Sequence, residues 1–521
     1  MAAITKPDPI LFINRFLCYG NEYPSYCPRF TKLTLAKTPH LKDMIEDEKR
    51  ANEVIAEIGR FSLQGSSVNR HALIFALAAC AHSKSPSAKH GAYALLPRIL
   101  LDSSELFTFI DYATTLSAPT SGWGHGQRNS ILNWYKNRSA VELGALVCKG
   151  KSRLKWTHRD VLRLIHPKAT NDGLAAVFMF IMKGYDTVKK TYAESDSTEV
   201  QTLLKYFYGV NEVKHTTDHQ VAARFIEEHI LTSAQVPTTL YTSKEVWGAL
   251  AQTMNYVELL NHLGKMTAIG VLEEDSPFTS NILVRITDSE LIRESKIHPV
   301  EIANLLKMYE CGHVSTMSKL NWIPYMPVME ALTNALHTSF ELLVPTDKTY
   351  CVAVDIAGSS TAGREHGVVT THISTITAAM VTALVRKEPE VAVFVFHSKE
   401  IQPISTNKSM SVENIASLLT PHITGGTDPS KPLTWATEQK TAFDVFLILS
   451  DLLQLSNDNT KEALKEYRAA VNPDAKLLVC GMKKNTMMFK TADYNDAGML
   501  DIVGFDERCP QLIAEFARGF K

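Results

Sequence analysis

The run KTYCVAVDIA at residues 348–357 marks the point where the character of the chain changes. It is continuously apolar and rich in β-branched residues, and three similar runs follow: EVAVFVFHS (390–398), AFDVFLILS (442–450) and AKLLVCGM (475–482). Unbroken runs of this kind are typical of strands buried on both faces of a parallel sheet. Helical patterns lie between and after them, at 371–386, 411–419, 459–470 and 511–519. The alternation predicts a doubly wound α/β domain over residues 346–521.

Upstream of this domain the pattern is helical. Segments such as NRHALIFALAACAHS (69–83) and TSKEVWGALAQTM (242–254) place apolar residues at helical spacing. Successive helix pairs of about 40 residues fit a degenerate HEAT-like array, and an irregular α bundle is the alternative. Residues 1–40 contain several prolines, which predict an ordered arm that packs on another part of the chain. The expected organisation is a helical domain at 1–345 followed by the α/β domain at 346–521.

The composition excludes several classes of protein. The 521 residues carry a net charge of only −1, so any attraction to nucleic acid must come from local patches. The eight cysteines form no CxxC pair, and no apolar run approaches the length of a membrane span. No Walker loop, HExxH, GxSxG or kinase signature occurs, so we expect no enzymatic activity. The expected location is the cytoplasm, with a nuclear share left open.

Positive charge is concentrated at residues 149–168, KGKSRLKWTHRDVLRLIHPK, where seven Lys or Arg face one acid. Thr157 followed by Asp160 is a capping-box pattern that predicts a helix from residue 158. On that helix Arg159, Arg163 and His166 fall at i, i+4 and i+7, which is one face. Such a ridge is typical of a site for RNA or another polyanion, and a solvated helix face is the alternative. The basic residues before residue 157, Arg153 and Lys155 among them, are expected in a mobile loop.

Three loops of the α/β domain bring oxygen ligands to the carboxyl ends of its strands. They resemble the metal-ion-dependent adhesion site of von Willebrand factor A domains, whose pattern is DxSxS, then Thr, then Asp. Asp355, Ser359, Thr427 and Asp451 match this pattern, whereas Ala357 replaces one ligand Ser. The resemblance implies a degenerate site for Mg²⁺, and a loop that keeps its fold without strong metal binding is the alternative.

The chain as a whole resembles the Ro autoantigen family, the TROVE-domain ribonucleoproteins. The resemblance rests on an ordered set of strings along the chain, including NRFLCYG (14–20), WGHGQRNSILNWY (123–135), KWTHRDVLRLIHPK (155–168) and NHLGKMTA (261–268). It implies a ring of HEAT-like repeats closed by the A domain. It also implies partners: small noncoding Y RNAs on the outer face, and the 3′ ends of misfolded RNAs in the central hole, in RNA quality control without catalysis.

The resemblance also implies which residues contact RNA. Arg159 and Arg163, with His166, carry over from the RNA-binding helix of the family. Weaker candidates are Arg128, Lys136, Arg153, Lys155 and, for the inner surface, Lys265, together with His125 and Gln127 as polar contacts. A nuclease could be recruited through the A domain. The competing hypothesis is a protein-interaction scaffold, whose A domain holds an acidic partner through a divalent cation.

Overall fold

The computed structural model describes residues 8–28, 32–118, 122–150, 152–313, 319–356, 373–419, 427–450, 458–482 and 490–520. The chain divides into two compact units. The first unit comprises residues 1–11, 23–31 and 255–521, and the second unit comprises residues 12–22 and 32–254.

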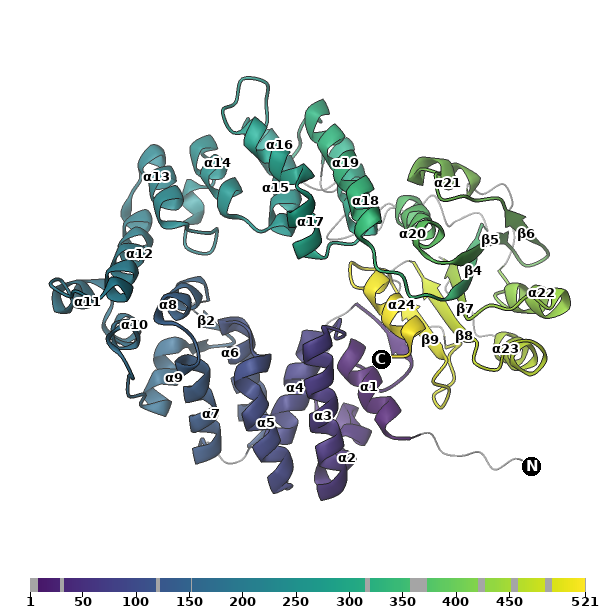
Figure 1. Cartoon of the computed structure of the whole chain (residues 1–521), viewed down its shortest axis with the longest axis horizontal. Helices are drawn as coiled ribbons and strands as arrows, with labels where there is room; N and C mark the ends of the chain where they lie inside the picture. Colours follow the sequence, from purple (N-terminus) through teal and green to yellow (C-terminus); the bar gives the residue numbers. More distant parts are fainter. Residues whose placement is uncertain are drawn as a thin grey trace. The chain divides into compact units, whose positions relative to one another are not determined.

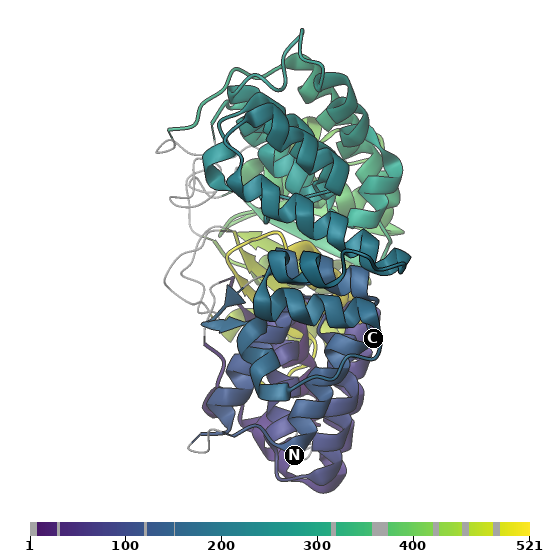
Figure 2. The same ribbon diagram turned by 90° about the vertical axis from the view of Figure 1, so that its left-hand side faces the viewer.

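The second unit consists almost entirely of helices joined by short links. Figure 1 shows them following one another in chain order, and Figure 2 shows the same helices after a quarter turn. Two 3₁₀ turns, Leu35–Lys37 and Thr238–Leu240, and one small hairpin interrupt the series. The helices are α1 (Ile10–Tyr19), α2 (Pro39–Glu46), α3 (Glu48–Gln64), α4 (Arg70–His82), α5 (Pro86–Ile99), α6 (Ser103–Leu116), α7 (His125–Lys136), α8 (Ala140–Lys149), α9 (His158–Ile165), α10 (Asp172–Lys183), α11 (Tyr185–Thr191), α12 (Thr198–His215), α13 (His219–His229) and α14 (Lys244–Thr253).

These helices pack on partners that are close in sequence. Helix α3 packs on α5, α4 on α6 and α5 on α7, as successive layers of a HEAT-like array do. Helix α4 is central in this stack, and every residue from Ala72 to Ala81 is buried. All of these side chains are apolar, and the alanines among them let neighbouring helices approach closely. None of the helices in the described ranges combines the length and apolarity needed to cross a membrane.

The first unit combines further helices with one large sheet. Its helices before the sheet are α15 (Tyr256–Ala268), α16 (Thr279–Thr287), α17 (Ser289–Ser295), α18 (Pro299–Glu310) and α19 (Met326–Leu342). The strands are β1 (Ser25–Tyr26), β4 (Thr349–Asp355), β5 (Glu390–Phe396), β6 (Ile401–Ile404), β7 (Val445–Ser450), β8 (Lys476–Gly481) and β9 (Met499–Val503). The helices that accompany the strands are α20 (Ile373–Lys387), α21 (Val412–Leu418), α22 (Lys431–Gln439), α23 (Asp458–Ala470) and α24 (Cys509–Arg518).

The sheet has seven strands in the order β1-β9-β8-β7-β4-β5-β6. All neighbouring pairs are parallel except β5 and β6, so the sheet is mixed. The four predicted strands are confirmed as β4, β5, β7 and β8, and the prediction of a helical region followed by an α/β domain is confirmed with them. Strand β1 comes from the N-terminal arm and pairs Ser25 with Asp501 and Tyr26 with Ile502 of β9.

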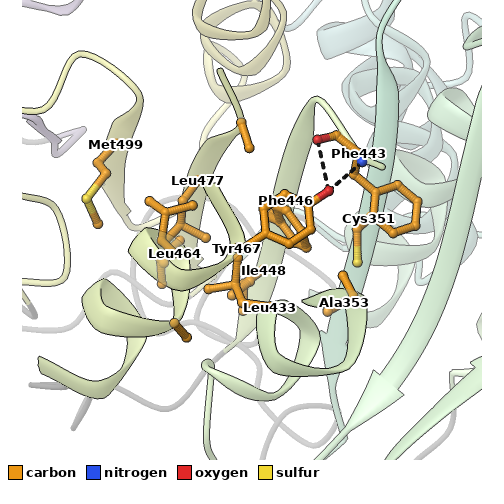
Figure 3. Packing of buried hydrophobic residues seen from close by; sticks show 14 of the residues in the cluster. Cys351, Ala353, Leu433, Phe443, Phe446, Ile448, Leu464, Tyr467, Leu477 and Met499 are labelled. Carbon is orange, nitrogen blue, oxygen red and sulfur yellow. Dashed lines mark hydrogen bonds between the residues drawn. The ribbon is translucent and has the colours of Figure 1, made fainter. Parts of the chain in front are cut away.

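One face of the sheet packs against α22 and α23 through a cluster of buried side chains (Figure 3). Phe446 and Ile448 of β7 meet Leu464 of α23 within it. Tyr467 of α23 is fully buried, and its hydroxyl is part of a chain of hydrogen bonds. The Phe443 N–H donates to Tyr467 Oη at 2.7 Å, and Tyr467 Oη donates to the Thr441 carbonyl at 2.9 Å. This hydroxyl therefore ties α23 to the residues that lead into β7.

Replacing Tyr467 by Phe should destabilise the protein, because the buried Phe443 N–H loses its acceptor. An unsatisfied buried donor costs about 1–3 kcal/mol. The change is measured as the shift of the unfolding midpoint in urea, with Tyr208→Phe at an exposed tyrosine as the matched control. Equal midpoints for the two variants would contradict the assigned role of the Tyr467 hydroxyl.

Candidate nucleic-acid interface

Helix α9 begins at His158, as the capping-box pattern predicts. Thr157 precedes the first turn in an extended conformation, and its Oγ1 accepts a hydrogen bond from the Asp160 N–H at 3.2 Å. In return, the Thr157 N–H donates to Asp160 Oδ2 at 3.2 Å. Two backbone donors that the helix itself cannot satisfy are thereby satisfied. The start of the cationic helix is consequently fixed.

The exposed face of α9 carries Arg159 and Arg163, while Val161, Leu162 and Ile165 are buried. Within the described part of the chain, no carboxylate forms an ion pair with either arginine. Arg159 is the second residue of the helix, where the positive end of the helix dipole disfavours a cation. Its position therefore does not serve helix stability, and it suits the binding of an anion.

His166 does not extend this face along the helix as the i+7 spacing predicted. The helix ends at Ile165, and His166 follows as its C-cap with a φ of 46°, in the left-handed region. The imidazole is exposed, next to the last helical turn. The helical part of the predicted ridge is thus limited to two arginines.

Two of the basic residues before α9, Arg153 and Lys155, lie in a hairpin and not in the predicted loop. Strand β2 (Ser152–Arg153) pairs antiparallel with β3 (Trp156–Thr157), so only Leu154 and Lys155 form the turn. Their φ angles are 53° and 69°, the combination that a type I′ turn requires. For a residue other than glycine, a left-handed φ costs about 1 kcal/mol or more. Arg153 and Lys155 are exposed, and Arg153 also donates to Ser104 Oγ.

A buried histidine anchors the start of α9 to two other helices. His158 is 3% exposed; its Nδ1 lies 2.7 Å from the Tyr135 hydroxyl of α7, and its Nε2 lies 2.9 Å from Ser103 Oγ of α6. Ser103 Oγ donates to the Leu146 carbonyl, so it accepts from His158 Nε2–H, and Nδ1 accepts from the tyrosine. Burial lowers the pKa of His158 to about 4, so the imidazole is neutral at pH 7.

Helix α7, which packs against α9, carries two further candidates. Arg128 is exposed and Lys136 is half-buried, so both can contribute positive charge to this surface. His125 is also exposed, whereas Gln127 is 4% exposed and is excluded as an RNA contact. Lys265 belongs to the other compact unit, where it is half-buried on α15.

The structure describes two of the four predicted metal ligands, Asp355 and Thr427. Asp355 ends β4 and is 1% exposed; Thr427 Oγ1 and Ser450 Oγ each donate to its Oδ2 at 2.6 Å. Ser359 and Asp451, like Ala357, lie outside the described residues. Ser450, the last residue of β7, was not predicted, although it directly precedes Asp451. The described residues hold no group of three His, Cys, Asp or Glu that could bind a metal.

The donor chemistry of this trio nevertheless fits a hard divalent cation. Carboxylate and hydroxyl oxygens are the ligands that Mg²⁺ prefers. A hydroxyl that donates its hydrogen to a carboxylate still has oxygen lone pairs that can face a cation. Asp355, Thr427 and Ser450 lie together at the carboxyl ends of the strands, where ligands bind in sheets of this type.

The buried His158 predicts a specific pH dependence of stability. The unfolded chain takes up a proton on this residue near pH 6.5, but the folded protein does so only near its pKa of about 4. Stability is therefore lost as the pH falls through this window, by about 2–3 kcal/mol between pH 7 and 4.5. His158→Gln should lose less stability over this range in urea titrations, whereas His166→Gln at the exposed histidine should follow the unmodified protein. Parallel pH profiles for all three proteins would rule out the effect.

Comparison with known proteins finds relatives that match nearly the whole chain. The TROVE domain family model matches residues 46–309, and the Ro60 vWA domain model matches residues 349–517. The chain is 30% identical to the RNA-binding protein RO60 of Caenorhabditis elegans, over 97% of the chain and 87% of that protein. It is 27% identical to the RNA-binding protein RO60 of Deinococcus radiodurans, over 97% and 92% respectively.

A solved structure shares the fold as well. The crystal structure of the Deinococcus radiodurans RO (RSR) protein superposes with a TM-score of 0.87 at 25% identity. The match covers 98% of this chain and 100% of that one. From the two domain matches and the relatives of similar length, we conclude that the chain belongs to the Ro60 family, with a TROVE domain followed by a Ro60-type von Willebrand factor A domain.

Proposed function

We propose that this protein binds RNA through the surface formed by α9, the β2–β3 hairpin and α7. The observation that carries the proposal is the pair Arg159 and Arg163, which are exposed, unpaired with any described carboxylate, and held on one face of a capped helix. The names of the two RO60 relatives describe RNA-binding proteins, which supports the same function here.

The two arginines suit the sugar–phosphate backbone. Residues four apart on a helix are separated by about 6 Å along its axis, which is comparable to the spacing of successive phosphates. Each guanidinium presents a planar set of N–H donors that can bind a phosphate through two hydrogen bonds. In a chain with a net charge of −1, this local patch supplies affinity, and the shape of the RNA supplies discrimination.

The finer features of the function are proposed from the family resemblance. The RNAs are small noncoding Y RNAs and the 3′ ends of misfolded noncoding RNAs, and the role is quality control. We propose that the protein acts without catalysis, in the cytoplasm and with a nuclear share, and that a nuclease is recruited through the A domain.

Reversing the two helix charges should abolish tight binding to a structured small RNA. Arg159→Glu with Arg163→Glu replaces two phosphate contacts by repulsion and leaves the buried face of α9 intact. For the unmodified protein, about four phosphate contacts give a slope near −3 for log K against log salt. Affinity and slope are measured by filter binding of a Y RNA.

The matched control is Lys84→Glu with Lys89→Glu, which makes the same change in net charge at two exposed lysines of the same unit. This control should keep most of the affinity. Unchanged binding by the Arg159/Arg163 variant, with an unchanged helical spectrum, would contradict the proposed interface.

As a second candidate function, we propose that the A domain binds a divalent cation and, through it, an acidic protein partner. The supporting observation is the convergence of Thr427 and Ser450 on the Asp355 carboxylate. Asp355 and Thr427 would hold the cation with Ser450 beside them, and Ser359 and Asp451 are proposed as further ligands from the sequence pattern. A bound cation would supply a positive centre that an acidic side chain of the partner can complete.

Removing one carboxylate charge should weaken this cation binding. Asp355→Asn should lower the affinity for Mn²⁺, used as a probe for Mg²⁺, by about tenfold or more, since a charged ligand becomes neutral. Titration calorimetry measures the affinity, and Glu413→Gln at an exposed carboxylate of α21 is the control. Failure of the unmodified protein to bind Mn²⁺ saturably would refute the second function. Chelation is expected to leave the RNA affinity unchanged, because the arginine surface needs no metal.

A further inference from the structure

A cavity of about 370 Å³ lies within the first unit, where α15 and α18 meet α20 and the link between β9 and α24. Helix α18 packs directly on α20, so the cavity has walls from the helices before the sheet and from the A domain (Figure 1). Its volume is in the range of sites for small molecules. Part of the wall is apolar, and Phe505 and Ile376 in it are each 4% exposed. The polar groups of the wall therefore decide which ligand the cavity can bind.

The polar part of the wall is acidic. Glu301, Asp506 and Glu507 belong to it, and the described lining residues include no Lys or Arg. Asp506 already has a partner, since its Oδ2 accepts a hydrogen bond from the Tyr26 hydroxyl at 2.9 Å. Glu507 is exposed, and its Oε1 lies 3.7 Å from Nε of Arg508. Glu301 is half-buried and forms neither an ion pair nor a side-chain hydrogen bond within the described ranges. It is the carboxylate of this cavity that lacks a counter-charge.

Helix capping does not explain Glu301. It is the third residue of α18, the position from which a glutamate commonly reaches back to the N–H of the N-cap residue. The N-cap is His298, whose Nδ1 accepts a hydrogen bond from the Val300 N–H at 3.2 Å, but Glu301 makes no return bond. Burial, together with the charge of Glu507, raises the pKa of Glu301 to about 7. An ionisable group in a cavity, without a structural partner, is typical of a binding site.

Two other side chains of the wall add hydrogen-bonding groups without positive charge. Burial lowers the pKa of His298 to about 3, so its imidazole is neutral at pH 7. Because its Nδ1 is an acceptor, its hydrogen is on Nε2. Asn304, three residues after Glu301, has a buried Oδ1 that accepts no hydrogen bond. Rotation of this amide by half a turn exchanges Oδ1 with Nδ2, so the side chain can present an acceptor to a ligand.

We propose that this cavity binds a small organic cation, an ammonium or guanidinium group on a short methylene chain. The Glu301 carboxylate pairs with the charged group, Asn304 accepts a further N–H, and the methylenes pack on the apolar wall. A metal ion fits less well, because Nε2 of His298 carries a hydrogen where a metal needs a lone pair. The bound cation contacts α18 and α20 together, so it stabilises the packing of the helices on the A domain.

The test titrates agmatine, which carries an ammonium and a guanidinium group on a short methylene chain, into the full chain at about pH 8. Titration calorimetry should show saturable binding. Glu301→Gln keeps the shape of the side chain and removes its charge, so it should weaken binding by about tenfold or more, the scale of a hydrogen bond to a charged group. The matched control is Glu330→Gln at an exposed carboxylate of α19, which should leave the affinity unchanged.

The protonation of Glu301 provides a second measurement. The other titratable groups that line the cavity are His298, Asp506 and Glu507. Lowering the pH from about 8 to about 6 protonates Glu301, because its pKa is about 7, and should weaken the binding of agmatine. Glu301→Gln should lose this step in affinity. A step of the same size in both proteins would contradict the role of Glu301.

A further variant separates binding from folding. Asn304→Leu removes a buried oxygen that has no donor, so the Tm of the free protein should not fall while the affinity for agmatine does. At a saturating concentration, agmatine should raise the Tm of the unmodified protein by mass action and leave that of Glu301→Gln nearly unchanged.

The lysine or arginine side chain of a partner protein carries the same chemistry as a free amine. A blocked Gly-Arg-Gly peptide is therefore titrated beside agmatine. Tighter binding of agmatine assigns the cavity to a free amine, and tighter binding of the peptide assigns it to a partner's side chain, and both support an organic cation.

Three results would overturn the proposal: no saturable binding of agmatine or of the peptide, equal affinities of the unmodified protein and Glu301→Gln, or displacement of agmatine by an equal concentration of Mg²⁺. The result is independent of the proposed RNA interface. Arg159→Glu with Arg163→Glu should bind agmatine as the unmodified protein does, because both arginines lie in the other compact unit.

Discussion

The reciprocal hydrogen bonds between Thr157 and Asp160 set the geometry of the whole candidate interface. Thr157 ends a strand and caps a helix, so one residue determines the directions of the hairpin and of α9 together. His158, the next residue, is buried between Tyr135 and Ser103 and prevents the helix from rotating about its axis. Arg159 follows immediately and is exposed. Most of the neighbours that determine the position of Arg159 are uncharged at pH 7. The exception is Asp160, whose hydrogen bonds lie within the cap.

The protein places two opposite kinds of binding chemistry in its two compact units. The second unit presents the guanidinium groups of Arg159 and Arg163, which form no ion pair with a carboxylate in the described ranges and attract anions. The first unit gathers a buried carboxylate and two hydroxyls at the carboxyl ends of β4 and β7, which suits a cation. The net charge of −1 reveals neither feature, because both depend on where individual charges are placed. A nearly neutral protein avoids general attraction to nucleic acid and can still hold one ligand firmly.

The sequence predicts the elements whose signal is local. The four apolar runs are strands, and the Thr-x-x-Asp pattern begins a helix, because each signal lies within a few adjacent residues. Strand β9 was missed because Asp501 interrupts its apolar run. That carboxyl group is 2% exposed and accepts hydrogen bonds from the N–H groups of Thr491 and Ala492, and burial raises its pKa to about 7. The hairpin turn was missed because Leu-Lys is not a turn sequence, and Ser450 was missed because its partner Asp355 lies 95 residues away.

The pairing of β1 with β9 has a consequence for the order in which the protein folds. Residues 25 and 26 leave the ribosome long before their partners, Asp501 and Ile502, which lie far later in the chain. The N-terminal arm must therefore stay unpaired throughout synthesis, while the helices that follow it can form as they emerge. Until β1 pairs with it, β9 is an open edge strand, to which another chain could add a strand. The pairing of β1 with β9 is thus a late event in the formation of this sheet.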